Sequence, residues 1–460
     1  MYTSIVRIYW THLYKKWIHS TINFMYSKRI RFWNTIVIVF ILISCPEWVF
    51  AQNFNYARKI VDTLASSSMH GRGYVDSGDR KAASYIAEQF KQLNLAHYGE
   101  DYYQKFNIPV NSFPGKMTIG INNNPLLPGV DYIVSPGCPS TLGEFKVLAL
   151  KVSDILDVAQ LIIKIKKANK KFLVIDLDES KGLSKKEKEV FQNNLNILKY
   201  AQDIQISGIV FLTSGKLTWS VSPVLETRPM VTIRKQSFND KIKSLVIEID
   251  SEYIPSYPTQ NVIAFLPAST KNDSMIVFTA HYDHLGRMGK NTLFPGANDN
   301  ASGIAMLLTL AEHYANRKDS LKYNMVFMAF GGEELGLKGS FHFVQNPLFP
   351  ISNIKFLVNM DISGTGDDGI QVVNGSVYKE EFNQLVRINQ NNNYLPQIKI
   401  RGAACNSDHC PFYKNGVPSF FIYTLGGIQA YHDVFDKAET LPLTAYDNYF
   451  KLLTGFVNEL

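Results

Sequence analysis

Three short apolar runs in the C-terminal half of the chain are separated by longer segments, one of which has apolar residues at helical spacing. The runs cover residues 274–280, 324–330 and 354–360 and are rich in β-branched and aromatic side chains, a composition typical of buried strands. The segment 303–317, between the first two runs, has the pattern of a helix. This strand–helix–strand order predicts a mostly parallel sheet with right-handed crossovers.

Side chains that commonly bind metals follow these predicted strands directly. His281 and Asp283 come after the first run, Glu333 and Glu334 after the second, and Asp361 after the third. In an open α/β sheet, the carboxyl ends of parallel strands meet at one edge, where the loops form a binding crevice. We therefore expect these side chains to lie close together.

Two further candidate ligands lie in polar segments outside the predicted strands. Asp299 is part of GANDNASG, just before the predicted helix, and His432 is part of YHDVFDKAET. Carboxylates and imidazoles in this combination suit two divalent ions that share one bridging carboxylate. Such a pair of ions activates water in co-catalytic hydrolases. Each residue alone has an ordinary explanation, such as helix capping, so the hypothesis depends on the complete set.

Six segments resemble peptidase family M28, a family of zinc peptidases that includes the bacterial leucyl-type aminopeptidases. In chain order they read AHYDHLG, GANDNASG, GGEELGLKGS, VNMDISG, SDHCPFYKNGVPSFF and YHDVFDKAET. They extend over about residues 256–460, and a weaker match covers residues 64–95. The resemblance implies an α/β fold of the zinc-exopeptidase type, in which helices flank a mostly parallel mixed sheet.

The resemblance also implies a role for each candidate residue in a site with two zinc ions per chain. The metal ligands would be Asp299 as the bridge, Glu334 and His432 in one site, and His281 and Asp361 in the other. Glu333 would be the general base, which takes a proton from water and returns it to the leaving amine.

Three further predictions concern residues close to these ligands. Asp283 lies two residues from His281, on the same face of an extended chain, so we expect it to fix the tautomer of that imidazole. Asp408, in the SDH segment, is a candidate for orienting substrate. His313 lies inside the predicted helix and is interpreted as structural, whereas His284, His342 and His409 are left unassigned.

Length and charge set the broad class of protein. A chain of 460 residues is too long for one ordinary core, which predicts two domains. The net charge is +7, but residues 1–52 contain six basic residues and one acidic residue. The remaining 41 basic and 39 acidic residues are nearly balanced, so the chain has no electrostatic footprint for nucleic acid.

Residues 116–250 differ in character from the segments around them. Apolar runs at 172–178, 208–214 and 229–235 predict strands, and the charged segment 179–203 predicts a helix. Their order resembles the protease-associated insert of some M28 peptidases. We therefore predict a targeting segment at 1–52, a catalytic domain formed by 53–115 and 251–460, and a smaller inserted α/β domain at 116–250. The alternative is a set of elaborated loops on one catalytic domain.

The N-terminal segment has features of a targeting sequence. Basic residues at 28, 29 and 31 precede the apolar run 35–44, which is short for a membrane span. Ala51 ends a plausible signal-peptidase site, whereas LISC, which ends at Cys45, resembles a lipoprotein box. Both readings predict export to the periplasm or beyond, and an uncleaved anchor helix is the alternative. In an oxidising compartment, Cys405 and Cys410 could form a small disulfide.

The predicted function is that of an exported zinc exopeptidase, an aminopeptidase acting on peptides with a free N-terminus. Contact with a membrane is expected only through the signal segment or a lipid anchor at Cys45. Three alternatives stay open: an aminoacyltransferase that resembles glutaminyl cyclase, a carboxypeptidase of the same family, and a non-catalytic binding protein. The presence of Glu333 argues against the last of these.

Overall fold

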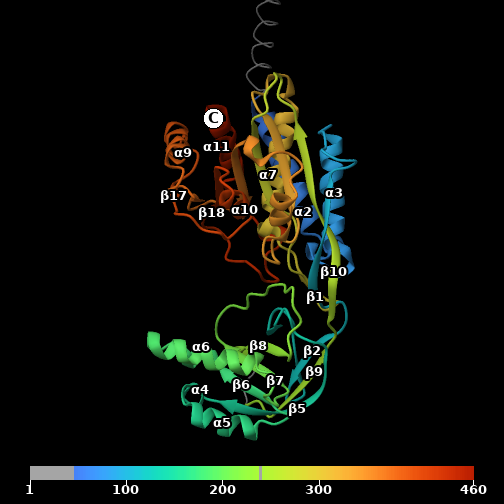
Figure 1. Cartoon of the computed structure of the whole chain (residues 1–460), viewed down its shortest axis with the longest axis vertical. Coiled ribbons are helices and arrows are strands. Elements are labelled where there is room, and N and C mark those ends of the chain that lie inside the picture. Colours follow the sequence, from blue (N-terminus) through green and yellow to red (C-terminus); the bar gives the residue numbers. More distant parts are fainter. Residues whose placement is uncertain (1–45, 238–240) are drawn as a thin grey trace, which may run out of the picture. The chain divides into compact units, whose positions relative to one another are not determined.

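The computed structural model describes residues 46–460 except 238–240 (Figure 1). Tyr56–Leu460 forms one compact unit. Of the preceding unit, Met1–Asn55, only the start of helix α2 (Pro46–Leu64) is described. Cys45 and the basic and apolar parts of the predicted targeting segment lie outside the described residues. Within 46–237 and 241–460, no helix has the length and apolarity needed to cross a membrane.

The main sheet has eight strands and is parallel at its centre. Its order is β1 (Tyr103–Ser112), β10 (Glu252–Leu266), β14 (Asn324–Phe330), β11 (Met275–His281), β15 (Ile354–Asp361), β18 (Ser419–Thr424), β16 (Ile370–Val373) and β17 (Ile398–Ile400). The four strands from β14 to β18 run parallel, whereas β10 and β16 pair with them in the antiparallel direction. The predicted mostly parallel mixed sheet and its three apolar strands are confirmed.

Helices cover both faces of this sheet, which explains why its central strands are apolar without alternation. On one face, Phe278 of β11 stacks on Tyr314 of α7, with ring centroids 6.0 Å apart. The neighbouring Val277 belongs to a core cluster that includes Phe343 of α8 and Phe412 of α10. Outside the segment between β1 and β10, the helices described after α2 are α3 (Gly78–Gln92), α7 (Ser302–Ala315), α8 (Lys338–Gln345), α9 (Lys379–Asn392), α10 (His409–Lys414) and α11 (Tyr446–Glu459).

A second eight-stranded sheet is formed by the chain between β1 and β10. Its order is β3 (Asn124–Leu126), β2 (Met117–Ile121), β9 (Ser244–Ile249), β5 (Thr141–Leu150), β6 (Phe172–Asp176), β7 (Gly208–Thr213), β8 (Met230–Arg234) and β4 (Tyr132–Val134). The same segment contains α4 (Val152–Leu156), α5 (Val158–Lys167) and α6 (Lys185–Tyr200). Because β1 and β10 pair with each other in the main sheet, the second sheet is an insertion between two paired strands.

Asp79, at the start of α3, is a buried carboxylate whose ionisation should oppose folding. It accepts hydrogen bonds from the hydroxyls of Tyr257 (2.7 Å) and Thr259 (2.9 Å), yet burial raises its pKa to about 6. The folded protein therefore binds this proton more tightly than the unfolded chain, in which the pKa of an aspartate is about 3.9. The contribution of Asp79 to stability is complete below about pH 4 and is lost as the pH rises through about 6.

We expect the Asp79→Asn variant to be more stable than the wild type at pH 8, by about 2 to 3 kcal/mol. At pH 4.5 the advantage should shrink to about 1 kcal/mol, because the wild-type carboxyl group is then largely protonated in the folded state. Urea denaturation at both pH values measures the difference. An advantage that does not change with pH would contradict the assignment of the effect to this ionisation.

Candidate metal centre

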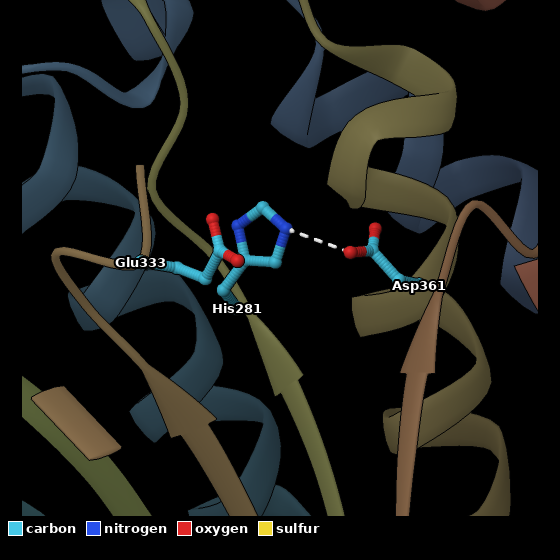
Figure 2. A group of neighbouring side chains, drawn as sticks. All are labelled: His281, Glu333 and Asp361. Atoms are coloured by element: carbon cyan, nitrogen blue, oxygen red, sulfur yellow. Dashed lines mark ion pairs between the residues drawn. The ribbon is translucent and has the colours of Figure 1, made fainter. Parts of the chain in front are cut away.

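The central strands bring three of the predicted residues to one edge of the main sheet. His281 ends β11 and Asp361 ends the adjacent parallel strand β15, while Glu333 follows β14 on the other side of β11. Figure 2 shows the imidazole of His281 between the two carboxylates. His281 Nε2 lies 3.4 Å from Asp361 Oδ2. The predicted placement of ligands at strand ends is therefore observed.

Asp299 joins these residues to a second group. One of its oxygens, Oδ1, lies 3.4 Å from His281 Nε2, and the other, Oδ2, lies 3.0 Å from His432 Nε2. His432 Nε2 is in turn 3.3 Å from Glu334 Oε2. The five predicted ligands thus form two groups that share Asp299.

The spacing of these atoms fits zinc. Ligand atoms about 2.0–2.2 Å from a tetrahedral zinc ion are about 3.3–3.6 Å from one another. The nitrogen–oxygen distances in the two groups run from 3.0 to 3.4 Å. Nitrogen and carboxylate oxygen are also the donors that zinc accepts in catalytic sites. Small movements of the side chains would therefore allow each group to hold one ion.

The loop that carries Asp299 is held by residues that are distant from it in the sequence. The Asp436 carboxylate accepts hydrogen bonds from the backbone N–H groups of Asn298 (2.8 Å) and Asp299 (3.0 Å). Arg72 donates to the carbonyl oxygen of Asp299 at 3.1 Å. The Asp299–Asn300 peptide bond is cis. A loop held by so many hydrogen bonds gives the shared carboxylate a defined position.

Arg72 is a fully buried cation beneath this loop and was not predicted as a site residue. Its guanidinium donates hydrogen bonds to the carbonyl oxygens of Leu64, Tyr282, Pro295, Gly296 and Asp299. Burial lowers its pKa to about 10, while the carboxylates of Asp299 and Asp436 oppose that shift. The group therefore keeps its charge at neutral pH and offsets part of the negative charge above it.

The glycines on either side of Arg72 explain how its backbone reaches this position. A Cβ on Gly71 would lie 2.4 Å from the Phe294 carbonyl oxygen, and one on Gly73 would lie 2.4 Å from the Gly286 Cα. Gly71 also has a φ of 62°, which favours glycine. The only signal in the sequence was the arginine between two glycines in the weaker match at 64–95.

Asp283 makes a different contact from the one we expected. Its Oδ1 lies 3.8 Å from His281 Nδ1, whereas its backbone carbonyl oxygen lies 3.1 Å from that nitrogen. The carboxylate instead accepts hydrogen bonds from the backbone N–H groups of Glu333 (3.1 Å) and Glu334 (3.3 Å). Asp283 thus contacts the His281 imidazole as expected, but through its carbonyl oxygen, while its carboxylate positions the glutamate pair.

The carbonyl contact still defines the imidazole tautomer. A carbonyl oxygen only accepts hydrogen bonds, so His281 Nδ1 carries a proton, and Nε2 faces Asp299 and Asp361, where it would bind a zinc ion through its lone pair. His284, which we left unassigned, is fully buried with its Nδ1 2.9 Å from Glu334 Oε1. His284 therefore orients the Glu334 carboxylate through Oε1, while Oε2 of the same carboxylate faces His432.

The pKa values of the two adjacent glutamates are shifted in opposite directions. Burial raises the pKa of Glu333 well above its usual value; Asp408 and Glu334 add to the shift, and His281 opposes it. For Glu334, burial and Asp299 also act to raise the pKa, but His432 and the hydrogen bond from His284 bring it down to about 2. Glu334 is thus suited to bind a cation, and Glu333 to accept a proton.

The remaining candidates lie near the centre or in structural contacts. Asp408 is fully buried, neither of its oxygens has a hydrogen-bond partner among the described residues, and burial raises its pKa to about 6. Its contact with substrate stays a prediction. His313 packs edge-on against Phe450, which agrees with its structural interpretation. The Cys405–Cys410 disulfide is present.

Comparison with known proteins finds similarity to peptidases. The model of peptidase family M28 matches residues 261–457. Aminopeptidase YwaD of Bacillus subtilis is 27% identical over 203 residues, which are 42% of this chain and 41% of that protein. A probable zinc metalloprotease of Pyricularia oryzae is 37% identical over 120 residues, 25% of this chain and 24% of the relative. The chain thus spans less than half the length of either relative.

Solved structures agree at the level of the fold. The zinc aminopeptidase BSAP from Bacillus subtilis has a TM-score of 0.63 and 20% identity, covering 88% of this chain and 94% of its own. The peptidase M28 precursor from Shewanella amazonensis has a TM-score of 0.63 and 16% identity, with coverages of 88% and 96%. The chain therefore has the α/β fold of these solved peptidases. In sequence, residues 261–457 match the model of peptidase family M28.

Proposed function

We propose that this protein is an exported exopeptidase that holds two zinc ions and removes N-terminal residues from peptides. The observation that carries the proposal is the pair of ligand groups that share Asp299. Glu333 lies beside His281 and Asp361 of the first group. The match of residues 261–457 to the model of family M28 and the relative named as an aminopeptidase support the same reaction.

The chain's own residues divide the work of hydrolysis. Bound zinc would polarise the peptide carbonyl and acidify water at this position. Glu333 accepts the proton of the attacking water and delivers it to the departing amine, a role that suits a buried carboxylate with a raised pKa. Asp283 holds the Glu333 backbone through its N–H group, and Arg72 with Asp436 fixes the loop of Asp299.

Peptides that differ only at their ends test the polarity of the reaction. A free-amine peptide should lose residues one at a time from its N-terminus. The rate for its N-acetylated form should be lower by at least about 10²-fold, because the site must recognise the free amine. Mass spectrometry of the products after incubation with zinc measures both. A peptide with an amidated C-terminus is the matched control and should be cleaved like the free peptide.

The same assay decides among the alternatives. Release of C-terminal residues alone would indicate a carboxypeptidase, and internal cleavage of the acetylated peptide would exclude an exopeptidase. Loss of ammonia from a peptide with N-terminal glutamine, without hydrolysis, would indicate the cyclase-like transferase. If zinc-loaded protein reacted with none of the peptides, a non-catalytic binding protein would be the remaining alternative.

The location and the insert complete the proposal. We propose export to the periplasm or beyond on the basis of the N-terminal sequence, with removal before Gln52 or lipidation at Cys45 as the two routes. Mass spectrometry of the N-terminus of the mature protein distinguishes them, and an intact first segment would contradict both. The second sheet lies within the predicted range 116–250, and we propose that it is the insert of the protease-associated type.

A further inference from the structure

The β7–β8 loop, residues 214–229 of the inserted segment, contacts the stretch of chain that carries His432. The ammonium group of Lys216 reaches three oxygens: the carbonyls of Gln429 (2.7 Å) and Tyr431 (3.0 Å), and Asp433 Oδ2 (2.7 Å). Asp433 is buried, whereas Lys216 is partly exposed. One lysine of the β7–β8 loop thus binds residues on both sides of the predicted zinc ligand.

Trp219 contacts His432 itself through two backbone groups. The N–H of Trp219 donates to the His432 carbonyl oxygen at 2.9 Å, and His432 Nδ1 donates to the Trp219 carbonyl oxygen at 3.0 Å. Because a carbonyl oxygen only accepts, Nδ1 carries a proton, and Nε2 faces Asp299 and Glu334, where it would bind a zinc ion through its lone pair. A hydrogen bond of this kind orients a metal-binding imidazole and raises its basicity.

The backbone of His432 needs such support. Its φ is 52°, in the left-handed region that residues other than glycine seldom occupy. A conformation of this kind persists only where surrounding contacts hold it. The contacts from Lys216 and Trp219 lie directly at this residue and its two neighbours.

The second sheet fixes the position of Trp219. Trp219 is 3% exposed and belongs to a core cluster made largely of residues from that sheet. The indole Nε1 donates to the carbonyl oxygen of Val134 in β4 at 2.9 Å, and the ring lies 4.6 Å from that of Phe294. The carbonyl that accepts the hydrogen bond from His432 is therefore held by the packing of Trp219 against the second sheet and Phe294.

We propose that the β7–β8 loop is part of the metal centre, in which Lys216 and Trp219 are positioning residues for His432. The inference rests on the proposed zinc site and adds that the inserted segment sets the affinity for one of the two ions. Loss of a group that orients a metal ligand typically lowers metal affinity by about 10- to 100-fold. His281 is oriented by Asp283 instead, so the other ion should be unaffected.

Lys216→Met tests the proposal, with Lys235→Met as the matched control. Lys235 directly follows β8 of the same sheet, lies 2.8 Å from Asp176, and has a side chain 38% exposed against 43% for Lys216. Competition with a chromophoric chelator measures the two zinc affinities. In Lys216→Met, we expect one zinc affinity to fall about 10-fold and kcat to change more than KM. In Lys235→Met, both zinc affinities should stay at the wild-type values. Equal affinities in the two variants would overturn the proposal.

Hydrogen exchange in the zinc-free protein separates this inference from the proposed function. Peptides that cover residues 425–436 should exchange faster in Lys216→Met than in the wild type or Lys235→Met, and Lys216→Arg should restore part of the protection. Unchanged exchange would refute the positioning role even in an enzyme that binds two zinc ions. A wild-type protein that binds no zinc would instead refute the proposed function, while exchange still reports on the restraint of His432.

Discussion

Removal of zinc with a chelator is expected to abolish peptide hydrolysis, and return of about two zinc ions per chain should restore it. The five predicted ligands form two groups that share one aspartate, and Glu333 lies beside His281 and Asp361 of the first group. Elemental analysis of fully active protein and titration of the zinc-free protein measure the stoichiometry. Full activity with at most one ion per chain would contradict the two-zinc site.

Asp299→Asn should weaken both zinc sites together, because each oxygen of this carboxylate faces a different histidine. Asp79→Asn is the matched control, since it also removes a buried carboxylate but lies outside the ligand groups. Zinc content after dialysis against a weak chelator should fall in the first variant and stay at the wild-type level in the second. Loss of one ion alone from Asp299→Asn would show that the carboxylate does not bridge.

The sequence was sufficient to predict the main sheet because its central strands are buried on both faces. A continuous apolar run that is followed by a helical segment is compatible with few folds other than a parallel sheet covered by helices. The register pairs Thr279 with Asn359, two residues before His281 and Asp361 respectively, so the two ligands reach the same level at the sheet edge. Because the local sequence determines where a strand ends, it also predicts which ligands lie at this edge of the sheet.

The contacts around the ligands were harder to predict because they depend on the paths of loops. Asp283 and His284 are neighbours in sequence, yet one binds the backbone of Glu333 and the other the side chain of Glu334. Arg72 lies more than 200 residues before the loop it stabilises. Spacing along the chain contains no information about where such loops meet.

The difference between the two glutamates is also invisible in the sequence. Glu333 and Glu334 have the same side chain and adjacent positions, and only their surroundings in the folded protein separate their pKa values. The role of Lys216 was equally hidden, because a lone lysine in a loop is usually solvated. Its partners lie on a segment more than 200 residues further along the chain.

Glu333→Gln should lower kcat by about 10² to 10⁴-fold while both zinc ions are retained, because the amide keeps the shape of the side chain but cannot accept the proton. The residue is not one of the five predicted ligands, and its backbone N–H is hydrogen-bonded to the Asp283 carboxylate, which the substitution leaves intact.

Glu334→Gln is the informative partner, since it changes the same side chain one position along the loop. The carboxylate of Glu334 lies 3.3 Å from His432 Nε2 and 2.9 Å from His284 Nδ1, so its loss should lower the zinc content at the His432 group as well as the rate. Steady-state kinetics and zinc analysis on both variants separate the two effects. Near-wild-type turnover in Glu333→Gln would show that another group accepts the proton, whereas loss of zinc from that variant would make Glu333 a ligand and leave Glu334 as the candidate base.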